Sequence, residues 1–599
     1  MEHPPYRLAE EFDRFLGDPN DPDEVFSYAR CAELDDREEF PADICHRFQE
    51  WGLPDHYVPV EHGGRLRDYE QVLQLARAVA RRDLTCAIGH GKTYLGGVCV
   101  WVAGTAEQAA GLGADIMAGV PVSLGLTERA HGSDLLAGDV RTDDKAPDTG
   151  DHWLVSGEKW LINNATRGSV LSLLTRTNPD GGPRGFSVLL VDKRELDEDT
   201  YRHLPKIRTH GIRGADISGI AFDGARVPRG ALVGAEGAGL EIVLKALQLT
   251  RTMCAALSLG AGDHGLRLGL DFAEERELYG RRLIELPQAR HVLSGAAADV
   301  LLHEAVALVA ARAVQTQTAE LSVTSAVTKY LLPTGTDQVL ADLTGLLGAR
   351  AFLKGVYADG RFQKVERDHR LVGLFDGNTL VNLNSLINQF RSLVRGYRRG
   401  TGDTAGAVAA CDLAAPLPPL DPAKLSLVAR HGSGVLAGLA ASVDEIARRA
   451  GTEPALAPVA EAARRLLAAT AAVHTEMEEY QGVLTEVPPA AFEVARRYAL
   501  CWAGAACVGL WTHSTGHVGD DPGTGALWRD GLWLHTALDR LLVRLGEPAA
   551  AGPETYEELL GALRAARSSG RLFSLLPQRS PERPAAAGTA AAESERTSC

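Results

Sequence analysis

The chain has few cysteines, and it has no long apolar segment free of charge. Its nine cysteines are scattered over 599 residues without a Cys-x-x-Cys pair, so neither a metal site nor a disulfide framework is predicted. No stretch of about 18 uncharged apolar residues is present, and the first residues are too acidic and polar for a secretory signal peptide. We therefore expect a cytoplasmic protein that makes no contact with a membrane.

The chain also has fewer basic than acidic residues. The chain has 62 Lys and Arg against 78 Asp and Glu, which gives a formal net charge of −16 at pH 7. A general grip on nucleic acid requires a basic surface, so this partner is not expected. Apolar residues make up 45% of the composition, which is enough to bury a large core. The length predicts several domains.

Apolar residues are spaced in three successive patterns over the first two thirds of the chain. Residues 1–120 show helical spacing. Residues 121–236 alternate short apolar stretches with Gly, Pro, Asn and Asp turns, as strands do. Residues 237–399 return to long amphipathic stretches and predict a helical bundle. The expected fold class is α+β, in the order helical, strand, helical.

The last third of the chain has a different composition. Residues 400–424 are rich in Gly, Ala and Pro and predict a linker. Ala-rich and Leu-rich helical patterns follow and predict an extra helical domain at residues 425–577. Residues 578–599 are rich in Pro, Ala, Ser and charge, so we expect a disordered tail there.

Two segments of the strand region end in polar turn residues. The first is Leu126-Thr-Glu-Arg-Ala-His-Gly-Ser-Asp134, and the second is Ser156-Gly-Glu-Lys-Trp-Leu-Ile-Asn-Asn164. Each could be an ordinary turn between strands. In this order and spacing, however, they are similar to flavin-binding segments of the acyl-CoA dehydrogenase and acyl-CoA oxidase superfamily. That resemblance extends over about residues 8–397, and it implies an FAD cofactor contacted by Leu126, Thr127, Ser133, Leu161 and Asn163.

Two later segments resemble the superfamily's contacts to the FAD of a neighbouring subunit. They are Glu275-Arg-Glu-Leu-Tyr-Gly280, followed by Pro287-Gln-Ala289, and Gly348-Ala-Arg-Ala-Phe352. The resemblance implies that Arg276 pairs with the FAD pyrophosphate, since a guanidinium suits a diphosphate. It also implies that Gln288 lies on the adenosine side and that Gly348 contacts the cofactor. An isolated helical Glu-Arg pair is usually only solvated surface. A homodimer or homotetramer is expected.

The segment Arg367-Asp-His-Arg-Leu-Val-Gly-Leu-Phe-Asp-Gly-Asn-Thr379 is the most informative. Alone, Asp-Gly-Asn is a good turn. The segment also matches, without a gap, the superfamily stretch that ends in an aromatic residue, the catalytic carboxylate and Gly. The resemblance makes Asp376 the base that removes the substrate α-proton and Gly377 the donor to the thioester carbonyl. Asn378 and Thr379 become flavin neighbours.

Helix residues near position 250 complete the predicted site. Arg251 would orient Asp376 or the substrate, or it could be an ordinary arginine that pairs with a carboxylate for stability. Thr250 stands where another branch of the superfamily carries its base, and we expect it to line the substrate site. No metal ligand is predicted. The catalytic pair is therefore Asp376 and Arg251, with Ser133, Thr250, Arg251 and Gly377 contacting substrate.

The implied reaction is oxidation of a saturated acyl thioester to the 2-enoyl thioester, on CoA or on an acyl-carrier protein. Oxygen or an electron-transfer flavoprotein would accept the electrons, and a later epoxidation is possible for related natural-product enzymes. Two alternatives stay open. A flavin monooxygenase of the same fold would usually lack the carboxylate at position 376. A DNA-binding flavoprotein would use the pairs Arg448-Arg449, Arg464-Arg465 and Arg496-Arg497.

Overall fold

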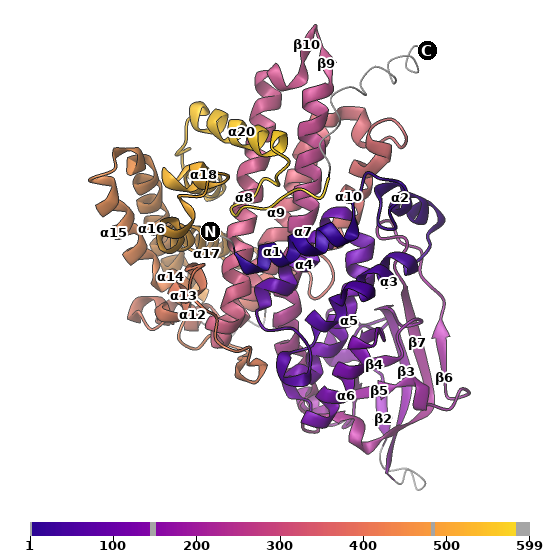
Figure 1. The fold of residues 1–599 in the computed structure, drawn as a ribbon. Coiled ribbons are helices and arrows are strands. Elements are labelled where there is room, and N and C mark those ends of the chain that lie inside the picture. Colours follow the sequence, from indigo (N-terminus) through magenta and orange to yellow (C-terminus); the bar gives the residue numbers. More distant parts are fainter. Residues whose placement is uncertain (1–2, 144–150, 481–485, 583–599) are drawn as a thin grey trace.

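The computed structural model describes residues 3–143, 151–480 and 486–582. Helices come first, a β-sheet follows, and the chain then returns to helices (Figure 1). The expected order of helical, strand and helical regions is therefore confirmed, as is the presence of further helices at the C-terminal end. The domain boundaries drawn from composition stay predictions. The strands of the eight-stranded sheet begin at Val122 and end at Val233.

The N-terminal region is helical, and it includes the apolar helix α5. Its helices are α1 (Pro4–Leu16), α2 (Tyr28–Arg37), α3 (Ala42–Trp51), α4 (Tyr69–Arg82), α5 (Leu84–Ala103) and α6 (Ala106–Met117). Helix α5 contacts α3, α4 and α6. The side chain of Asp83 caps α5 by accepting a hydrogen bond from the Cys86 N–H at 2.8 Å, which satisfies a free donor of the first turn. Most of α5 is buried, because it packs against α4, α7 and strand β1.

The middle region is a mixed sheet of eight strands within the described residues. The strands are β1 (Val122–Gly125), β2 (Arg141–Asp143), β3 (His152–Asn163), β4 (Val170–Arg176), β5 (Phe186–Asp192), β6 (Tyr201–Leu204), β7 (Ile217–Pro228) and β8 (Leu232–Val233). Their order is β6-β7-β3-β2-β4-β5-β8, with β1 parallel to β4. The long β3–β7 pair shifts register between Trp160 and Ile162, so β3 has a bulge at Leu161 close to its end.

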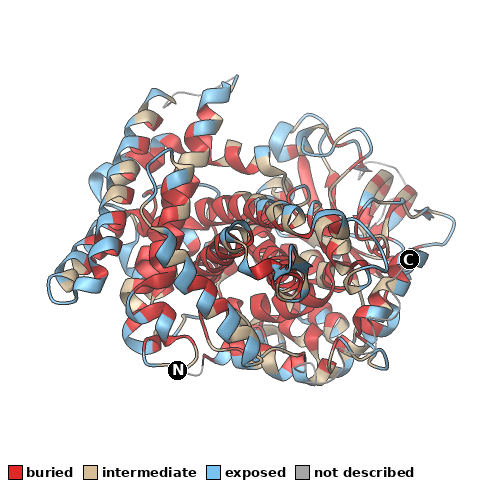
Figure 2. Cartoon of the chain, turned by 90° about the horizontal axis from the view of Figure 1, so that it is seen from above, coloured by how far each residue is buried: buried red, intermediate tan, exposed pale blue. Residues whose placement is uncertain are grey.

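Three long helices form the centre of the molecule. They are α7 (Gly239–Glu275), α8 (Pro287–Thr316) and α9 (Leu321–Leu347). The shorter α10 (Arg361–His369) and α11 (Thr379–Ile387) pack against them, and α12 (Phe390–Arg399) packs against the helices at the C-terminal end. Figure 2 shows the three long helices as the buried centre. Within the described residues, α7 and α8 are long and apolar enough to cross a membrane. However, 78% and 94% of their apolar windows are buried against protein.

The hairpin between α7 and α8 extends away from the sheet. It consists of β9 (Glu277–Leu278) and β10 (Arg281–Arg282), and it lies at the far tip of the long helices (Figure 1). Tyr279 at the turn is 95% exposed. Phe352, on the loop that follows α9, is 85% exposed. Two large apolar side chains this exposed are typical of a surface that another protein covers.

The predicted linker is partly helical. Residues Thr404–Cys411 form α13, whose first turn is capped by Asp403 through the Gly406 N–H at 2.9 Å. The buried guanidinium of Arg312 on α8 holds this segment by donating to backbone oxygens, those of Ala409, Ala410, Asp412 and Ala415. These contacts bury a segment whose composition predicts free chain.

The C-terminal helices pack against one another. They are α14 (Gly434–Ala437), α15 (Leu439–Ala450), α16 (Ala457–Met477), α17 (Pro489–Val518), α18 (Gly525–Arg529), α19 (Leu532–Arg544) and α20 (Pro553–Ser568). Of these, α17, α19 and α20 also pack against α8. Asp299 on α8 is buried and pairs with Arg540 and Arg544 of α19, each at 2.7 Å. This ion-pair group and an apolar interface hold the domain onto the central bundle.

The expected disordered tail begins too early. Gln578 is buried, and Glu582 forms an ion pair with Arg267 of α7 and accepts a hydrogen bond from Tyr28 at 2.8 Å. These contacts anchor residues 578–582, so the prediction of disorder is wrong there. The rest of the predicted tail, residues 583–599, lies outside the described residues.

Candidate active site

Asp376 lies on a tight turn between α10 and α11. Its φ angle is 55°, and Gly377 follows with φ of 91°. Aspartate is one of the few residues with a side chain that tolerate this left-handed region, and glycine adopts it freely. Asn378 then begins α11, because its side chain accepts a hydrogen bond from the Val381 N–H at 3.0 Å. The Asp-Gly-Asn sequence therefore forms both a turn and a helix start.

Buried cations hold the backbone of this turn. Arg251 on α7 donates from Nε to the Asp376 carbonyl oxygen at 2.8 Å. Lys329 on α9 donates to the carbonyl oxygens of Val372 and Gly377, at 2.7 and 3.3 Å. A Cβ atom added to Gly377 would lie 2.9 Å from the Arg251 guanidinium, so only glycine fits without movement. Arg251 thus contacts Asp376 through the backbone, and its role in orienting the base or the substrate stays a prediction.

The Asp376 carboxylate faces a different helix. Lys92 on α5 lies with its Nζ 3.2 and 3.4 Å from the two carboxylate oxygens. The thiol of Cys254 on α7 lies 3.8 Å from Oδ2. The side chains of Lys92 and Asp376 are 12% and 9% exposed, so this ion pair is largely removed from water. Lys92 also lies 3.9 Å from the centre of the Phe375 ring.

Sequence reasoning missed Lys92, although the sequence held a signal. The α5 sequence contains a single Asp, Glu, Lys or Arg residue, and this residue is Lys92. A lysine in an otherwise apolar, buried helix is rarely present without a partner. The identity of that partner could not be inferred, because Asp376 is distant in sequence.

Burial changes the titration of the groups around Asp376. It lowers the pKa of Arg251, and the negative charge of Asp376 opposes that change. It also lowers the pKa of Lys329, again opposed by neighbouring anionic groups. Burial and then the Asp376 charge raise the pKa of Cys254 to about 12. Cys254 is therefore a neutral thiol at physiological pH and can donate a weak hydrogen bond to the carboxylate.

The end of β3 carries the second group of predicted site residues. Leu161, at the bulge, has φ of 57° and is 40% exposed. Among the described residues, Asn163 Oδ1 and Trp160 Nε1 are buried without a hydrogen-bond partner. A buried polar atom left unpaired is costly, so it marks a place where a polar ligand belongs. These atoms therefore fit a bound flavin. The neighbouring Asn164 donates to the Gly89 carbonyl oxygen of α5 at 2.8 Å.

Residues of strand β3 hold the first predicted flavin loop in place. Lys159 donates to the Leu126 carbonyl oxygen at 3.0 Å and pairs with the buried Glu128 at 2.7 Å. The Trp160 N–H donates to the Thr127 carbonyl oxygen at 2.9 Å. Ser133 is exposed at the end of the loop. The backbone of Leu126 and Thr127 is thus held next to the β3 strand that carries Leu161 and Asn163.

Thr250 lies on α7, one residue before Arg251. It is buried, and its hydroxyl donates to the Leu247 carbonyl oxygen of its own helix at 3.4 Å. Its contact with substrate stays a prediction. Thr379 is half-buried at the first position of α11, beside the Asp376 turn, so its position is compatible with the predicted flavin contact.

The structure places Arg276, Gln288 and Gly348 far from Asp376 within one chain. Arg276 follows the last residue of α7, about 37 Å along the helix axis from Arg251 at 1.5 Å per residue. Gln288 is exposed at the start of α8, and Gly348 is exposed after α9. These residues lie at the tip that also carries Tyr279. They therefore cannot contact an FAD of the same chain whose ring is bound beside Asp376.

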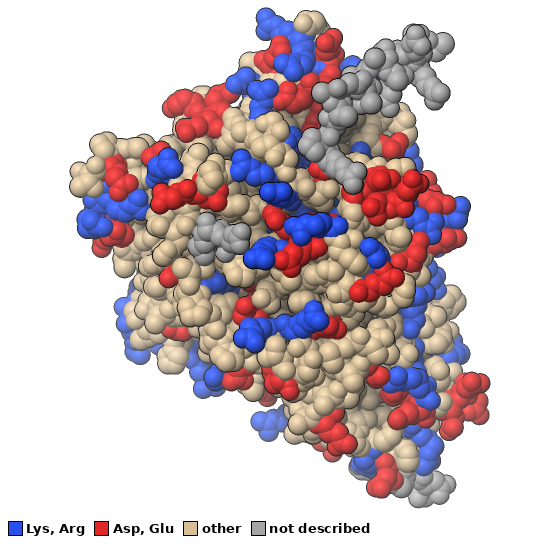
Figure 3. Space-filling model, viewed as in Figure 1, with Lys and Arg blue, Asp and Glu red and all other residues tan. Residues whose placement is uncertain are grey.

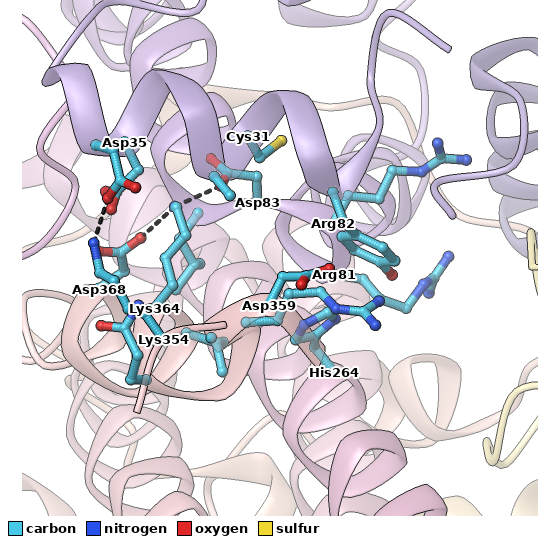
Figure 4. Close-up of a pocket in the computed structure, with 18 of the residues that line it drawn as sticks. Cys31, Asp35, Arg81, Arg82, Asp83, His264, Lys354, Asp359, Lys364 and Asp368 are labelled. Atoms are coloured by element: carbon cyan, nitrogen blue, oxygen red, sulfur yellow. Dashed lines mark hydrogen bonds and ion pairs between the residues drawn. The ribbon is translucent and has the colours of Figure 1, made fainter. Parts of the chain in front are cut away.

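A cavity of about 400 Å³ lies between α2, α7, α10 and the junction of α4 with α5 (Figure 4). It contains none of the predicted site residues. Its charges pair with one another: Lys364 binds Asp83 at 2.5 Å and Asp368 at 2.7 Å. Cys31, Cys86 and Asp83 lie close enough to hold a metal ion, but the Asp83 carboxylate already binds Lys364. The cavity is therefore lined by ion pairs that hold α10 against the start of α5.

The fold and the site define a class of protein. A turn with a buried carboxylate lies between two helical regions, and the adjoining sheet offers buried polar atoms without a partner among the described residues. This arrangement is compatible with the flavin-dependent oxidoreductases of acyl thioesters that the sequence resembles.

Comparison with known families identifies the class more narrowly. The family models for the N-terminal, middle and C-terminal domains of acyl-CoA dehydrogenase match residues 24–119, 123–225 and 237–390. Together they cover more than half of the chain. The chain belongs to the acyl-CoA dehydrogenase family, so it is an oxidoreductase and its cofactor is FAD.

Individual relatives share the same domains. A probable acyl-CoA dehydrogenase of Mycobacterium tuberculosis is 25% identical over 377 residues, which are 63% of this chain and 94% of that protein. The structure of an acyl-CoA dehydrogenase with FAD from Bacillus anthracis has a TM-score of 0.65 at 17% identity, and the match covers 94% and 91% of the two chains. The prolyl acyl carrier protein oxidase AnaB has a TM-score of 0.59 at 16% identity, over 65% and 99%. These two structural likenesses concern the fold.

Proposed function

We propose that the protein oxidises a saturated acyl thioester to the 2-enoyl thioester, with Asp376 removing the α-proton. The observation that carries this proposal is the position of the Asp376 carboxylate. It is largely buried, the backbone behind it is fixed by Arg251 and Lys329, and it lies in the helical region that follows the flavin strand β3. A base held in this way needs little reorganisation before it acts.

The chain's own residues perform the proton transfer. The α-hydrogen of a thioester is weakly acidic, so the site must stabilise negative charge on the carbonyl oxygen as the proton leaves. The N–H of Gly377 supplies a donor for that oxygen in the proposed complex. This N–H shares a peptide group with the Asp376 carbonyl oxygen, which accepts a hydrogen bond from Arg251 at 2.8 Å, so the peptide group has a fixed orientation.

FAD, when bound, supplies the acceptor for the β-hydride. Residues near the Asp376 turn and at the end of β3 would hold its ring, namely Leu126, Thr127, Ser133, Leu161, Asn163, Asn378 and Thr379. Arg276, Gln288 and Gly348 of a second subunit would hold its diphosphate and adenosine. Their distance from Asp376 within one chain and the exposed Tyr279 and Phe352 support at least a homodimer.

We further propose that the acyl group is carried by an acyl-carrier protein, with acyl-CoA as the second candidate. The fold likeness to an acyl carrier protein oxidase supports this carrier. Asp376 is one methylene shorter than glutamate, by roughly 1.5 Å, so the thioester must lie close to the turn. Oxygen is the proposed electron acceptor, and an electron-transfer flavoprotein is the alternative.

The decisive test follows flavin absorbance without oxygen. The FAD-loaded protein is mixed anaerobically with saturated acyl-CoAs of several lengths and with the same acyl groups on a carrier protein. We expect one substrate class to bleach the flavin and the Asp376→Asn variant to slow this at least ~100-fold, as loss of a general base does. Asp444→Asn, an exposed carboxylate of α15, serves as the matched control and should bleach normally. Admission of air then shows whether oxygen reoxidises the flavin.

The alternative functions predict other results. If no thioester bleaches a fully loaded flavin, acyl oxidation is excluded and the monooxygenase becomes the better hypothesis. The DNA-binding hypothesis loses support from the surface charges. The six arginines that it would use are each paired with a glutamate. Figure 3 shows acidic and basic side chains interspersed over the face in view.

A further inference from the structure

We propose that Lys92 is a positioning residue that orients the Asp376 carboxylate through a direct ion pair and is displaced from it when the acyl thioester binds. This inference rests on the proposed function, because it treats Asp376 as the base. Lys92 does not belong to the flavin or thioester contacts derived above. It comes from the N-terminal helical domain, whereas the base comes from the central bundle.

The position of Lys92 is energetically unfavourable unless its ammonium group has a partner. Helix α5 is buried on most sides, and its other residues carry no formal charge apart from the titratable His90. Removing an ammonium group from water without a partner costs several kcal/mol. The contacts of Nζ within the described residues are the two oxygens of Asp376 and the face of Phe375. Both belong to the turn that carries the base.

The Asp376 carboxylate, in turn, has few other constraints. Charged and titratable groups approach it from four helices: Tyr69 of α4, Lys92 of α5, Arg251 and Cys254 of α7, and Lys329 of α9. Arg251 and Lys329 bind backbone oxygens. Cys254 offers only a thiol at 3.8 Å. Within the described part of the chain, Lys92 is therefore the cation that fixes the direction of the carboxylate.

The same contact must open during the reaction. A cation that lies on both carboxylate oxygens occupies the side from which a C–H group would have to approach. Displacement leaves the ammonium close to the Phe375 ring, where a cation–π contact at 3.9 Å can retain it. The ion pair thus keeps the base aimed in the free enzyme, and substrate binding supplies the free energy to separate it.

The first test is the pH dependence of kcat/KM, which reports the free enzyme. A cation beside a carboxylate favours its charged form, and Lys92 Nζ lies 3.2 and 3.4 Å from the two carboxylate oxygens. Its removal in Lys92→Met should therefore move the acidic limb of the profile towards neutrality. Lys92→Arg should restore the wild-type limb. Lys245→Met removes a partly exposed lysine of α7 that pairs with Glu241, and it should leave the limb unchanged. An acidic limb of Lys92→Met that superimposes on the wild type would overturn the proposal.

The second test needs no substrate, so it separates this inference from the proposed function. Melting temperatures are compared for the wild type, Lys92→Met, Asp376→Asn and the double variant, all loaded with FAD. Because each single change leaves the other group buried without its partner, the two losses should not add. Additive losses would show that the pair does not interact and would overturn the inference. If no thioester bleaches the wild type, the proposed function fails while this cycle still measures the ion pair.

Discussion

Asp376 combines a chemical requirement with a backbone requirement. Its φ of 55° lies in a region where most side chains cost roughly 1–2 kcal/mol and aspartate is better tolerated. The turn therefore favours the shorter acid over glutamate, quite apart from catalysis. An aspartate at this position is consistent with the geometry of this loop.

Substitution of Asp376 by glutamate tests this explanation. The variant regains a methylene but places a longer side chain in the left-handed region and against Lys92. We expect a lower melting temperature than the wild type and slower anaerobic bleaching of the flavin, with activity above that of Asp376→Asn. A glutamate variant that is both as stable and as fast as the wild type would show that the turn does not select the residue.

Asn163 allows a test of cofactor fit that does not depend on activity. Its Oδ1 is buried without a partner among the described residues, which costs about 1–3 kcal/mol if nothing binds there. We expect Asn163→Leu to stabilise the apoprotein and to reduce the rise in melting temperature that FAD produces. An unchanged FAD-dependent shift, measured by thermal unfolding with and without added FAD, would contradict this role.

At the scale of single residues, the sequence predicted part of the site. The structure brings Asp376, Gly377 and Arg251 together, and their association was predicted through the resemblance of their segments to the superfamily, not from any one of these residues alone. Lys92 was missed because its importance depends on a contact between a helix and a turn that are distant in sequence. A periodic pattern indicates which face of a helix is buried, but it does not indicate which side chain that face will meet.

Among the helices, α13 shows why composition misled the prediction. Residues 400–424, which include this helix, have a Gly, Ala and Pro content typical of flexible chain, yet Ala407, Ala410 and Cys411 are buried. The helix persists because Arg312 of α8 satisfies the carbonyl oxygens at its end. A buried arginine about a hundred residues earlier in the chain therefore holds this segment in place. The sequence of the segment itself does not indicate this contact.

The contact between α8 and α19 depends on pH. Burial tends to raise the pKa of Asp299, but the charges of Arg544 and Arg540 overcome this effect and hold its pKa below the ordinary value. In acid, the unfolded chain then binds a proton that the folded chain does not, so this stabilisation is present above about pH 4 and is lost as pH falls further.

We expect Asp299→Asn to weaken this contact at neutral pH. The loss should be roughly 1–3 kcal/mol, because the two arginines are partly exposed and are therefore partly screened. The melting temperature of the variant should also fall less steeply between pH 5 and pH 3 than that of the wild type. Parallel curves over this range would show that Asp299 does not contribute to the acid sensitivity.

At the scale of the whole molecule, the order of regions could be predicted because each has its own apolar period. The far tip could be assigned a role only through resemblance, since exposed side chains carry no periodic signal. In the structure this tip gathers Arg276, Gln288 and Gly348 with the exposed Tyr279 and Phe352, which is why we propose that it belongs to a subunit interface.

Phe352→Asp tests that interface directly. A charge introduced at a position that is 85% exposed in one chain should be harmless to a monomer but unfavourable in an apolar contact. We expect smaller particles in light-scattering measurements and a lower ratio of FAD to protein after purification. Asp342→Asn, a charge change on α9 outside the loop that carries Phe352, is the control. A variant that keeps both its size and its FAD would exclude this surface from the interface.

Glu304 on α8 joins the two ends of the chain. Its Oε1 accepts hydrogen bonds from Tyr6 and Arg77 at 2.6 Å and from Ser574 at 2.5 Å, and its Oε2 accepts one from the Leu575 N–H at 2.8 Å. Synthesis at about 5–20 residues per second separates the appearance of Tyr6 and Ser574 by roughly half a minute to two minutes. During this interval, α1 and α4 can dock onto α8 only with an incomplete hydrogen-bond network around a buried carboxylate. The final closure of the fold is therefore a step that follows translation.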